Sequence, residues 1–534
     1  MPDVKKIIKI SWRVLKLLAL MLFIALIIAA IYFQAPWKVT ALLLIILVAN
    51  VLLPKGEKRW FWVAAGVVVI ALIVWVFLPE DNIGWKPYTF DKELAAIEAK
   101  RAVPDSENAA IIYNQLLADA NNASEPNLPG MCETRSDPWL NKDYPEIAQW
   151  LKNKENTLSL LIQASKKEFC RFPVKADFYD TADLNRLSVL RKCARLLIRF
   201  ANNDWAENRT DAAMEKYFCI LQMAKHMYRQ PAMTDFLVAI ALESLSTGQL
   251  KKFIITGNPT DEQLTQIEKI LVEIKHDWTL DWPMILDCEK LLCKNMLGTL
   301  IYEANPKGKV RFSHDSTAVI RAQQLSNIPP PRSCLKKSLK ANTILMWFFM
   351  PSTPQEAGRI IDHSYEKYYA MAKPDFDWTK APDELSAKPK YRLNYQTLIE
   401  LMTGMMGGSC CSIHDIYLRN IANQRGSELI IGLRRFKNKI GQWPESLDEI
   451  KNLVPAEAFI DPLNTGSFVY RPTVENFILY SKGKNGIDEN GKYQTHSSMD
   501  SSGNWTIKTK EDDWLIWPNK SCDTEKECSD GKQQ

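Results

Sequence analysis

The sequence predicts a mainly α-helical protein with three parts: N-terminal transmembrane helices, an extracytoplasmic helical array, and a small α+β module near the C-terminus. Three observations lead to this prediction. Three apolar stretches lie within the first 78 residues. Apolar residues then recur at helical spacing between Asp91 and Tyr302. Near the C-terminus, a long amphipathic segment precedes two short runs of aromatic and β-branched residues, a pattern typical of a helix followed by a hairpin.

The apolar stretches cover about residues 14–33, 39–53 and 60–78. A helix needs about 20 residues to cross the hydrocarbon core of a bilayer, so the first and third stretches are long enough, while the second needs its flanking residues. We therefore predict a membrane anchor of three transmembrane helices in residues 1–79. A cleaved signal peptide is disfavoured, because a second apolar run follows the first at once. The remaining alternative is that these segments are core helices of a soluble protein.

The positions of the cations predict how the anchor is oriented. The segment before the first stretch and the connection between the second and third are rich in Lys and Arg, whereas the connection at residues 34–38 holds a single cation. Cytoplasmic loops carry such an excess of cations. The chain beyond Pro79 is therefore expected in the periplasm, held to the bacterial cytoplasmic membrane. The cations on the cytoplasmic side are Lys5, Lys6, Lys9, Arg13, Lys16, Lys55, Lys58 and Arg59.

The charge balance argues against nucleic-acid binding. The whole chain has a formal net charge of +5, but residues 1–78 contain nine Lys and Arg against two Asp and Glu and so account for +7. The remaining chain has a charge of −2. A protein that binds nucleic acid normally presents a clustered basic face. The expected partners are therefore the lipid bilayer and other proteins of the envelope.

All eleven cysteines follow the predicted anchor. An exported location permits disulfides, and Cys522 with Cys528 is the pair that the spacing favours. Cys193 and Cys219 fall at apolar helical positions, so we expect them to be small buried side chains. Cys410 and Cys411 are either a strained vicinal disulfide or two thiols, and the second is favoured. The sequence lacks Cys-x-x-Cys, which argues against a zinc ribbon or a thioredoxin-type site.

The helical array is expected at residues 80–302. Leu187, Leu190, Ala194 and Leu197 define one broad apolar face. Thr260-Asp-Glu-Gln263 has the pattern of a capping box that opens another helix. The array is either tetratricopeptide-like or irregular, since no clean 34-residue period is present. Beyond it we predict an irregular linker at 303–342, a helical extension at 343–409 with a glycine-rich hinge at 404–409, an α+β module at 410–520 and a polar tail at 521–534.

The C-terminal module is expected to begin with a helix over Ile413–Lys439 that ends at Gly441, because glycine tolerates the left-handed cap. Ser446 and Glu449 have capping-box spacing. Two strands at Phe468–Arg471 and Phe477–Tyr480 should form a hairpin, with a third strand at 514–517.

This module resembles the soluble part of type II secretion pseudopilins. The matching residues are Trp443-Pro-Glu-Ser-Leu447, the Asp461-Pro462 turn, and the loop from Leu479 to Gly486. The chain departs from that family because about 400 residues precede its long helix. The resemblance implies a calcium site in the acidic loop that follows the second strand; the alternative is a solvated acidic loop. The implied calcium ligands are Asp488, Asn490, Asp500, Asp512 and Asp513.

A larger part of the chain, from about residue 95 to 520, resembles uncharacterised large envelope proteins of planctomycete-like bacteria. The shared elements are Glu-Asn-Ala-Ala-x-x-Tyr, here Glu107–Tyr113, and Cys-Arg-Phe-Pro, here Cys170–Pro173. The resemblance implies an architecture of paired helices and this C-terminal module. It implies no activity.

No established catalytic motif is present. His-Asp dipeptides occur at His276, His314 and His414, but neighbouring helical residues point about 100° apart and cannot share one ligand face. Gly-x-Ser-x-Gly, His-Glu-x-x-His and the phosphate-binding loop are absent. The sequence therefore favours a non-enzymatic scaffold or protein-binding protein of the envelope. The alternatives are an exported hydrolase with an unfamiliar site, or a secretion-associated, calcium-binding relative of pseudopilins.

Overall fold

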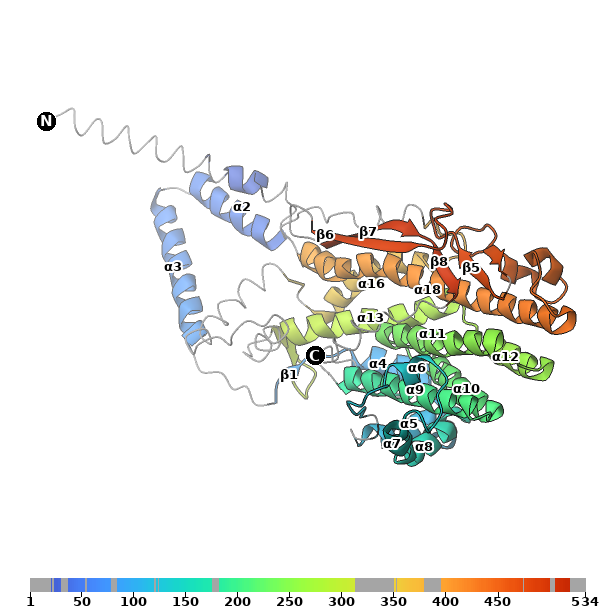
Figure 1. Ribbon diagram of the computed structural model, residues 1–534. Coiled ribbons are helices and arrows are strands. Elements are labelled where there is room, and N and C mark those ends of the chain that lie inside the picture. Colours follow the sequence, from blue (N-terminus) through green and yellow to red (C-terminus); the bar gives the residue numbers. More distant parts are fainter. Residues whose placement is uncertain are drawn as a thin grey trace. The chain divides into compact units, whose positions relative to one another are not determined.

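The described part of the chain is mainly helical and contains three small antiparallel sheets (Figure 1). This is a computed structural model, and its chain divides into two compact units, each assembled from separate stretches: unit 1 comprises 1–96, 175–179 and 286–410, and unit 2 comprises 97–174, 180–285 and 411–534. The predicted array at 80–302 is thus divided between the units. The structure describes residues 21, 24–29, 37–52, 55–77, 84–119, 122, 124–174, 182–312, 350–351, 353–378, 395–473, 475–499 and 505–518.

The second and third N-terminal apolar stretches form helices α2 (Trp37–Leu52) and α3 (Lys55–Phe77). They are 16 and 23 residues long. Within the described residues, no helix combines the length and the apolar character needed to cross a bilayer. The predicted transmembrane helices are therefore not confirmed, and most of the first apolar stretch lies outside the described residues.

Unit 1 also contains a short sheet and two helices that lie close to it in the sequence. Strands β1 (Lys86–Pro87), β2 (Tyr302–Ala304) and β3 (Val310–Phe312) pair antiparallel in that order. Most of α13 (Trp278–Ile301) belongs to this unit, and α16 (Pro354–Ala370) begins where the Thr353 hydroxyl accepts a hydrogen bond from the Glu356 amide.

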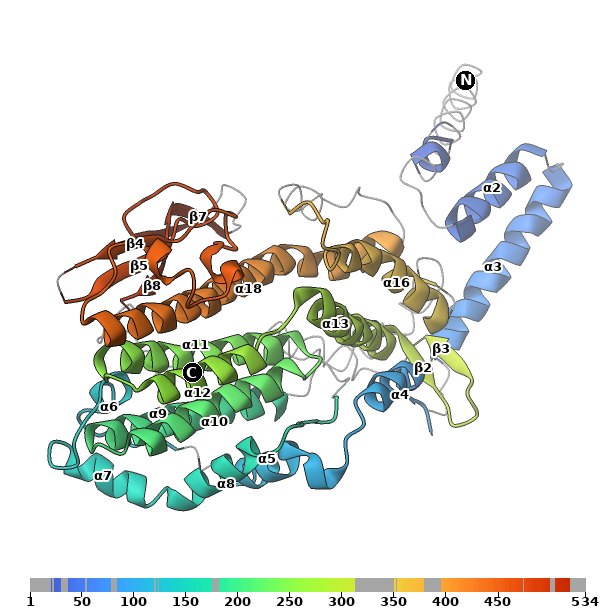
Figure 2. The same cartoon turned by 90° about the vertical axis from the view of Figure 1, so that its right-hand side faces the viewer.

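Unit 2 contains most of the helical array. Consecutive helices α9, α10 and α11 pack against one another, and the predicted apolar face of α9 is buried (Figure 2). The capping box that opens α12 is confirmed, since the Thr260 hydroxyl and the Gln263 side chain each accept a backbone amide of the other residue. Helix α4 (Asp91–Lys100) begins in unit 1 and ends in unit 2. The other helices of the array in unit 2 are η1 (Asp105–Glu107), α5 (Ala109–Leu117), α6 (Glu133–Ser136), α7 (Pro145–Lys152), α8 (Glu155–Ser165), α9 (Ala182–Ala206), α10 (Thr210–Tyr228), α11 (Met233–Thr256) and α12 (Asp261–Glu273).

The long helix before the C-terminal sheet is longer than predicted. It is α18 (Tyr395–Ile440), and it runs without a break through residues 404–409, so the predicted glycine-rich hinge is wrong. Its end is confirmed: Gly441 has φ +94°, and its amide donates to the Lys437 carbonyl at 2.8 Å. Each glycine disfavours a helix by only about 1 kcal/mol relative to alanine, and the helical residues on both sides outweigh this cost.

The predicted hairpin and third strand are confirmed. Strands β4 (Val469–Pro472), β5 (Phe477–Ser481) and β8 (Trp514–Trp517) form an antiparallel sheet in that order. A second ribbon, β6 (Tyr493–Met499) with β7 (Trp505–Asp512), was not predicted, because its serines, threonines and charged residues lack an apolar alternation. Two short helices, η3 (Leu447–Ile450) and η4 (Ala456–Phe459), precede the sheet.

The C-terminal module and the array share one hydrophobic core. This core combines buried residues of α9 to α12 with residues of α18, β5 and β8. Figure 2 shows α18 between α11 and α12 on one side and β4, β5 and β8 on the other. Glycine permits a close approach at Gly426, where an added Cβ would lie 2.5 Å from the Ile516 side chain. The residues from Cys411 onward are therefore part of unit 2 rather than a separate cap.

The described cysteines are mostly buried thiols. Burial raises the pKa of Cys193 and of Cys219 to about 12, as expected for small buried side chains. Neither Cys410 nor Cys411 is part of a disulfide, so the vicinal disulfide is excluded. Cys132 is disulfide-bonded. The predicted Cys522–Cys528 pair lies outside the described residues.

One lysine within this core has a carbonyl as its hydrogen-bond partner. Lys251 on α11 is 5% exposed, and its ammonium donates to the Ile516 carbonyl on β8 at 3.0 Å. Burial lowers the pKa of Lys251 to about 8. This ammonium group loses its hydration and pairs with no carboxylate among the described residues, so its charged form destabilises the folded state.

We expect the free energy of unfolding to rise as the pH increases from about 8 to about 10.5, by up to about 3 kcal/mol from this group. Between those values the unfolded state binds the Lys251 proton and the folded state does not, so stability rises with pH. The Lys251→Met variant should lack this contribution, whereas Lys269→Met, at an exposed lysine of α12, should retain it. Urea denaturation at several pH values measures the difference, and equal pH slopes in all three proteins would contradict the assignment.

Candidate functional site

A pocket of about 400 Å³ lies in unit 2 where the end of α10 faces the connection between α12 and α13. Its wall carries cations and carboxylates in equal number and one exposed leucine, Leu280, which is 73% exposed. His276 is its only imidazole. The lining residues are Lys225, Tyr228, Arg229, Glu273, Ile274, Lys275, His276, Asp277, Leu280 and Asp281.

His276, one of the three histidines singled out in the sequence, lies at the back of this pocket. Its Nδ1 is 3.2 Å from Asp281 Oδ2, and its Nε2 is 3.4 Å from the Asn420 amide nitrogen. Because the amide nitrogen can only donate, Nε2 is the acceptor and Nδ1 carries the proton that is shared with Asp281. The ring stacks on Tyr228 with centroids 4.1 Å apart and meets Tyr417 edge-on.

Behind His276 is a buried carboxylate that sequence reasoning missed. Glu243 on α11 is 1% exposed. It accepts hydrogen bonds from the Tyr228 hydroxyl at 2.5 Å, from the Asn420 amide at 3.0 Å, and from the Gln424 amide at 2.6 Å. Burial, then the Glu243 charge, raises the pKa of Tyr228 well above its ordinary value, so the phenol remains a donor. We call Tyr228, Glu243, His276, Asn420 and Gln424 the Glu243 network.

The structure brings His414 close to the same aromatic cluster. The rings of His276 and His414 both contact Tyr417, and His414 also meets Trp278 edge-on. Burial, together with the charge of Lys484, lowers the pKa of His414 to about 3, so this ring is neutral. His314 lies outside the described residues.

This arrangement stabilises the fold more readily than it supports hydrolysis. The Asp281 carboxylate orients the imidazole of His276 as a general base requires, but Nε2, the atom that would accept a proton, faces the buried Asn420. Its contacts tie α18 to α10 and α11. The geometry therefore does not add support to the hydrolase alternative.

Three of the predicted calcium ligands accept hydrogen bonds from arginines. Asp488 accepts from Arg471 at 2.8 Å and from the Tyr480 hydroxyl at 2.7 Å. The Tyr480 hydrogen bond, despite some burial, helps to lower the pKa of Asp488. Asn490 accepts from the same guanidinium at 2.8 Å. Asp512 lies apart from them and accepts from Arg419 at 2.7 Å. A cation is thus already present beside each of these side chains.

Asp513 differs from the other predicted ligands. It is fully buried, and its Oδ2 accepts the backbone amides of Glu489 and Gly491 at 2.8 and 2.7 Å. Its Oδ1 is buried and lacks a hydrogen-bond partner within the described part of the chain. Burial raises the pKa of Asp513, and the charges of Glu489 and Asp488 add to this effect.

The five predicted ligands are therefore not assembled as one set. Asp500 lies outside the described residues. Among the residues that are described, no three His, Cys, Asp or Glu side chains are placed to share a metal ion. Calcium needs six to eight oxygen ligands, which can include backbone carbonyls. The calcium site remains a prediction.

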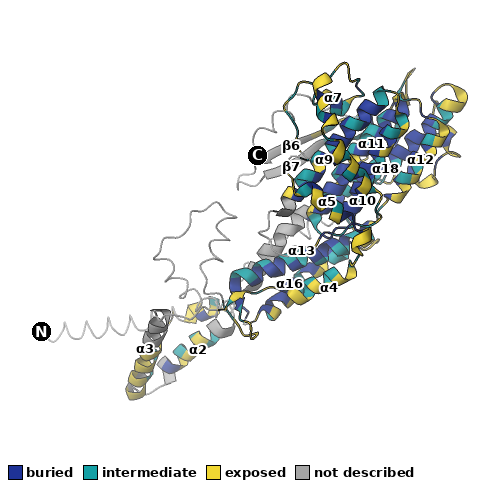
Figure 3. Ribbon diagram, turned by 90° about the horizontal axis from the view of Figure 1, so that it is seen from below, coloured by how far each residue is buried: buried dark blue, intermediate teal, exposed yellow. Residues whose placement is uncertain are grey.

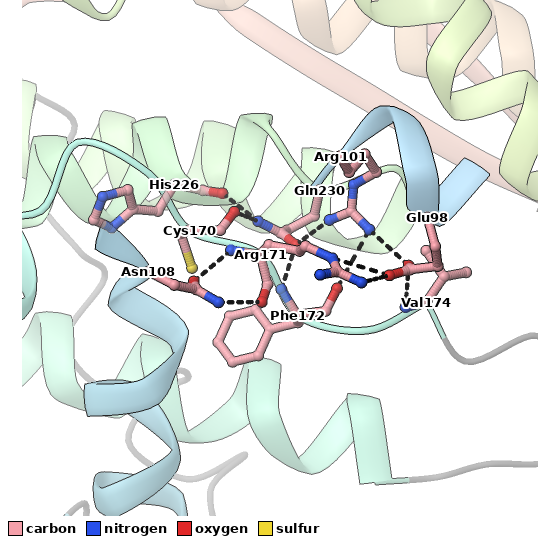
Figure 4. A network of polar contacts seen from close by, with 9 residues as sticks. All are labelled: Glu98, Arg101, Asn108, Cys170, Arg171, Phe172, Val174, His226 and Gln230. Carbon is pink, nitrogen blue, oxygen red and sulfur yellow. Dashed lines mark hydrogen bonds and ion pairs between the residues drawn. The ribbon is translucent and has the colours of Figure 1, made fainter. Parts of the chain in front are cut away.

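Two segments singled out in the sequence, Glu107–Tyr113 and Cys170–Pro173, meet in unit 2 (Figure 4). The Asn108 side chain caps α5 by accepting from the Ala110 amide at 3.1 Å. The same side chain accepts from the Arg171 amide at 2.8 Å and donates to the Arg171 carbonyl at 3.1 Å. The Asn108 side chain thus makes the two backbone hydrogen bonds to Arg171 that a neighbouring strand would otherwise make.

Glu98 holds the next residues of this segment. It pairs with the Arg171 guanidinium, accepts the Val174 amide at 2.8 Å and pairs with Arg101 at 3.2 Å. Burial opposes ionisation, but these hydrogen bonds outweigh it, and the pKa of Glu98 is lowered. Glu98 on α4 lies more than 70 residues from Arg171. No local sequence signal identifies it as a partner.

The end of α10 completes this contact. Gln230 donates to the Cys170 carbonyl at 2.8 Å and accepts the Phe172 amide at 3.2 Å. His226, four residues earlier, donates from Nε2 to the Lys167 carbonyl and accepts the Tyr113 hydroxyl at Nδ1. Burial lowers the pKa of His226 to about 4, so this imidazole is a neutral structural group.

Comparisons with protein-family models, with curated proteins and with solved structures find no match to this chain.

We expect Glu243→Ala to lower the free energy of unfolding by about 3 kcal/mol or more, because three buried donors lose their acceptor. The matched control is Glu268→Ala on α12, which removes a partly exposed pair with Arg435 and should cost less than about 1 kcal/mol. Urea denaturation of both variants measures the contrast. Losses of similar size would show that the Glu243 network is not a major stabilising feature.

Proposed function

We propose that this protein is a membrane-anchored scaffold or protein-binding protein of the bacterial envelope, with the chain beyond residue 79 on the extracytoplasmic side. The observation that carries the proposal is the exposed apolar surface of α2 and α3, where Trp60 is 74% exposed and Val67 is 60% exposed (Figure 3). Water-exposed apolar patches of this kind favour contact with lipid or with another apolar surface. The other exposed apolar residues there are Leu42, Leu44, Ile45, Val48, Trp62, Val63 and Val68.

Two further observations support this location. Lys55, Lys58 and Arg59 lie at the start of α3, next to Trp60 and Trp62 in the sequence. This is the composition of a cytoplasmic membrane interface. The disulfide of Cys132 fits an oxidising compartment beyond the membrane.

The buried polar side chains have structural hydrogen bonds, and this favours a binding role over catalysis. In unit 2 the buried candidates for acid–base chemistry, His226, Glu243 and His276, are engaged in hydrogen bonds that hold helices together. The helices leave mixed-charge pockets on their surfaces, which suit recognition of a partner by complementary charge. Other envelope proteins are the proposed partners.

The full chain should sediment with membranes and resist extraction by alkaline carbonate. Placing charges on the apolar surface, in the double variant Leu44→Lys and Val67→Lys, should release it, because a charged side chain in hydrocarbon costs about 2.5–3.5 kcal/mol. The control is Val272→Lys, at an exposed apolar residue of α12, which should leave sedimentation unchanged. A wild-type chain recovered in the supernatant, or a periplasmic reporter inactive after Gln534, would refute the anchor.

Calcium binding by the C-terminal loop is a second candidate function. It is favoured by the buried Oδ1 of Asp513, which has no hydrogen-bond partner among the residues that the structure describes. If the loop binds calcium, millimolar calcium should raise the thermal unfolding midpoint, and Asp513→Asn should abolish this increase. Asp448→Asn, at an exposed aspartate of the same unit, is the control. An equal midpoint in calcium and in chelator would rule out this function.

A further inference from the structure

Unit 1 contains a larger pocket, of about 630 Å³, that has no counterpart among the sites predicted from the sequence. It lies where the first turn of α4 faces α13 and α16. Its volume is in the range of small-molecule sites. The lining residues are Tyr88, Thr89, Phe90, Asp91, Lys92, Glu93, Lys294, Gln355, Gly358, Arg359 and Asp362.

A buried ammonium group fixes the floor of this pocket. Lys294 on α13 has a side chain that is 3% exposed. Its Nζ lies 2.9 Å from both oxygens of Glu93 and 2.8 Å from Asp362. These three hydrogen bonds use the whole donor capacity of the ammonium group. Lys294 therefore organises the floor and has no donor left for a ligand.

The carboxylates of the floor are paired, which matters for where a ligand can bind. Lys294 pairs with both Glu93 and Asp362. Lys290 lies 3.5 Å from Asp362 and 3.8 Å from Asp287, so its positive charge is shared between these two carboxylates. The floor therefore has one more carboxylate than lysine, and this charge disfavours an anionic group at the floor and leaves the rim as its place.

The charges that remain at the rim are mainly positive. Lys92 and Arg359 are exposed, and neither forms an ion pair within the described part of the chain. Asp91, the one further carboxylate, accepts from the Thr89 hydroxyl at 2.7 Å. The N-terminus of α4 also faces this space, and its dipole favours negative charge. The rim thus offers donors for an anionic group.

One wall of the pocket is aromatic. Tyr88 and Phe90 meet edge-to-face with centroids 5.2 Å apart. Gly358 on α16 lies against Phe90, and a Cβ added there would lie 3.0 Å from the Phe90 ring. The missing side chain keeps α16 close to this wall. The wall provides an apolar surface beside the cationic rim.

We propose that this pocket binds a small organic anion. Its carboxylate or phosphate group would pair with Arg359 and Lys92, and its apolar or aromatic body would pack on Tyr88 and Phe90. The geometry favours an anion over an amine because the carboxylates of the floor are already paired with lysines, whereas the cations of the rim are not. Binding here is independent of the proposed anchoring through α2 and α3.

Titration calorimetry of the purified full-length chain tests the proposal with three probes of similar size: phenylphosphate, phenylacetate and benzylamine. We expect saturable binding of at least one of the two anions. Arg359→Gln and Lys92→Gln should each weaken that binding by about tenfold, the loss expected for one charge-assisted hydrogen bond. The control Lys373→Gln removes an exposed lysine just beyond α16 and should leave affinity within about twofold of wild type.

The relative affinity of the two anions decides between a phosphate and a carboxylate as the natural group. Benzylamine binding as tightly as the anions would overturn the proposal, because the floor carboxylates would then be the recognition element. Absence of saturable binding by both anions, or unchanged affinity in both rim variants, would also overturn it. Both rim residues are exposed, so unfolding curves of the variants should match the wild type and exclude misfolding as the cause of lost binding.

Discussion

Unit 2 depends on a carboxylate that is buried where three helices meet. Glu243 on α11 accepts one hydrogen bond from α10 and two from α18, and its partners on α18 are 177 and 181 residues away in the sequence. A buried charge is tolerated only when donors surround it. The need to place two donors of α18 beside Glu243 fixes the rotation and the register of α18 against the array. The hydrophobic core that α18 shares with the array and with β8 then follows from this placement.

The same principle recurs at other places in the molecule. Asn108 and Glu98 hold the Cys170–Val174 segment through its backbone, and Lys294 joins α4 to α16 through two carboxylates. These side chains lie in the interior, where each polar group needs a partner. Residue types that suggest catalysis in a sequence are here used to hold segments together. That is why the proposed activities lie at the surface, at the apolar α2 and α3 and at the exposed rim of the unit 1 pocket.

Features set by neighbouring residues could be predicted from the sequence. The Thr260 capping box, the Gly441 helix end and the hairpin of β4 and β5 each depend on a few adjacent residues, and each is present as predicted. The ribbon of β6 and β7 was missed because its residues do not alternate between apolar and polar. The hinge at 404–409 was wrongly predicted because the low helix propensity of glycine takes no account of the helical residues on both sides. Of the candidate sites, His276 was noticed, but Glu243, Asn420 and Lys294 carry no local signal.

The sequence by itself determined the mainly helical class, the position of the apolar N-terminal segments and most of the strands near the C-terminus. Those properties depend on periodicity and turn chemistry, which are written in neighbouring residues. Only the tertiary structure decided that the array and the C-terminal sheet share a core, that three of the predicted calcium ligands accept hydrogen bonds from arginines, and that Lys92 and Arg359 line one pocket. The physical reason is that burial and pairing join residues far apart in the chain, and such partners are unknown until the helices pack.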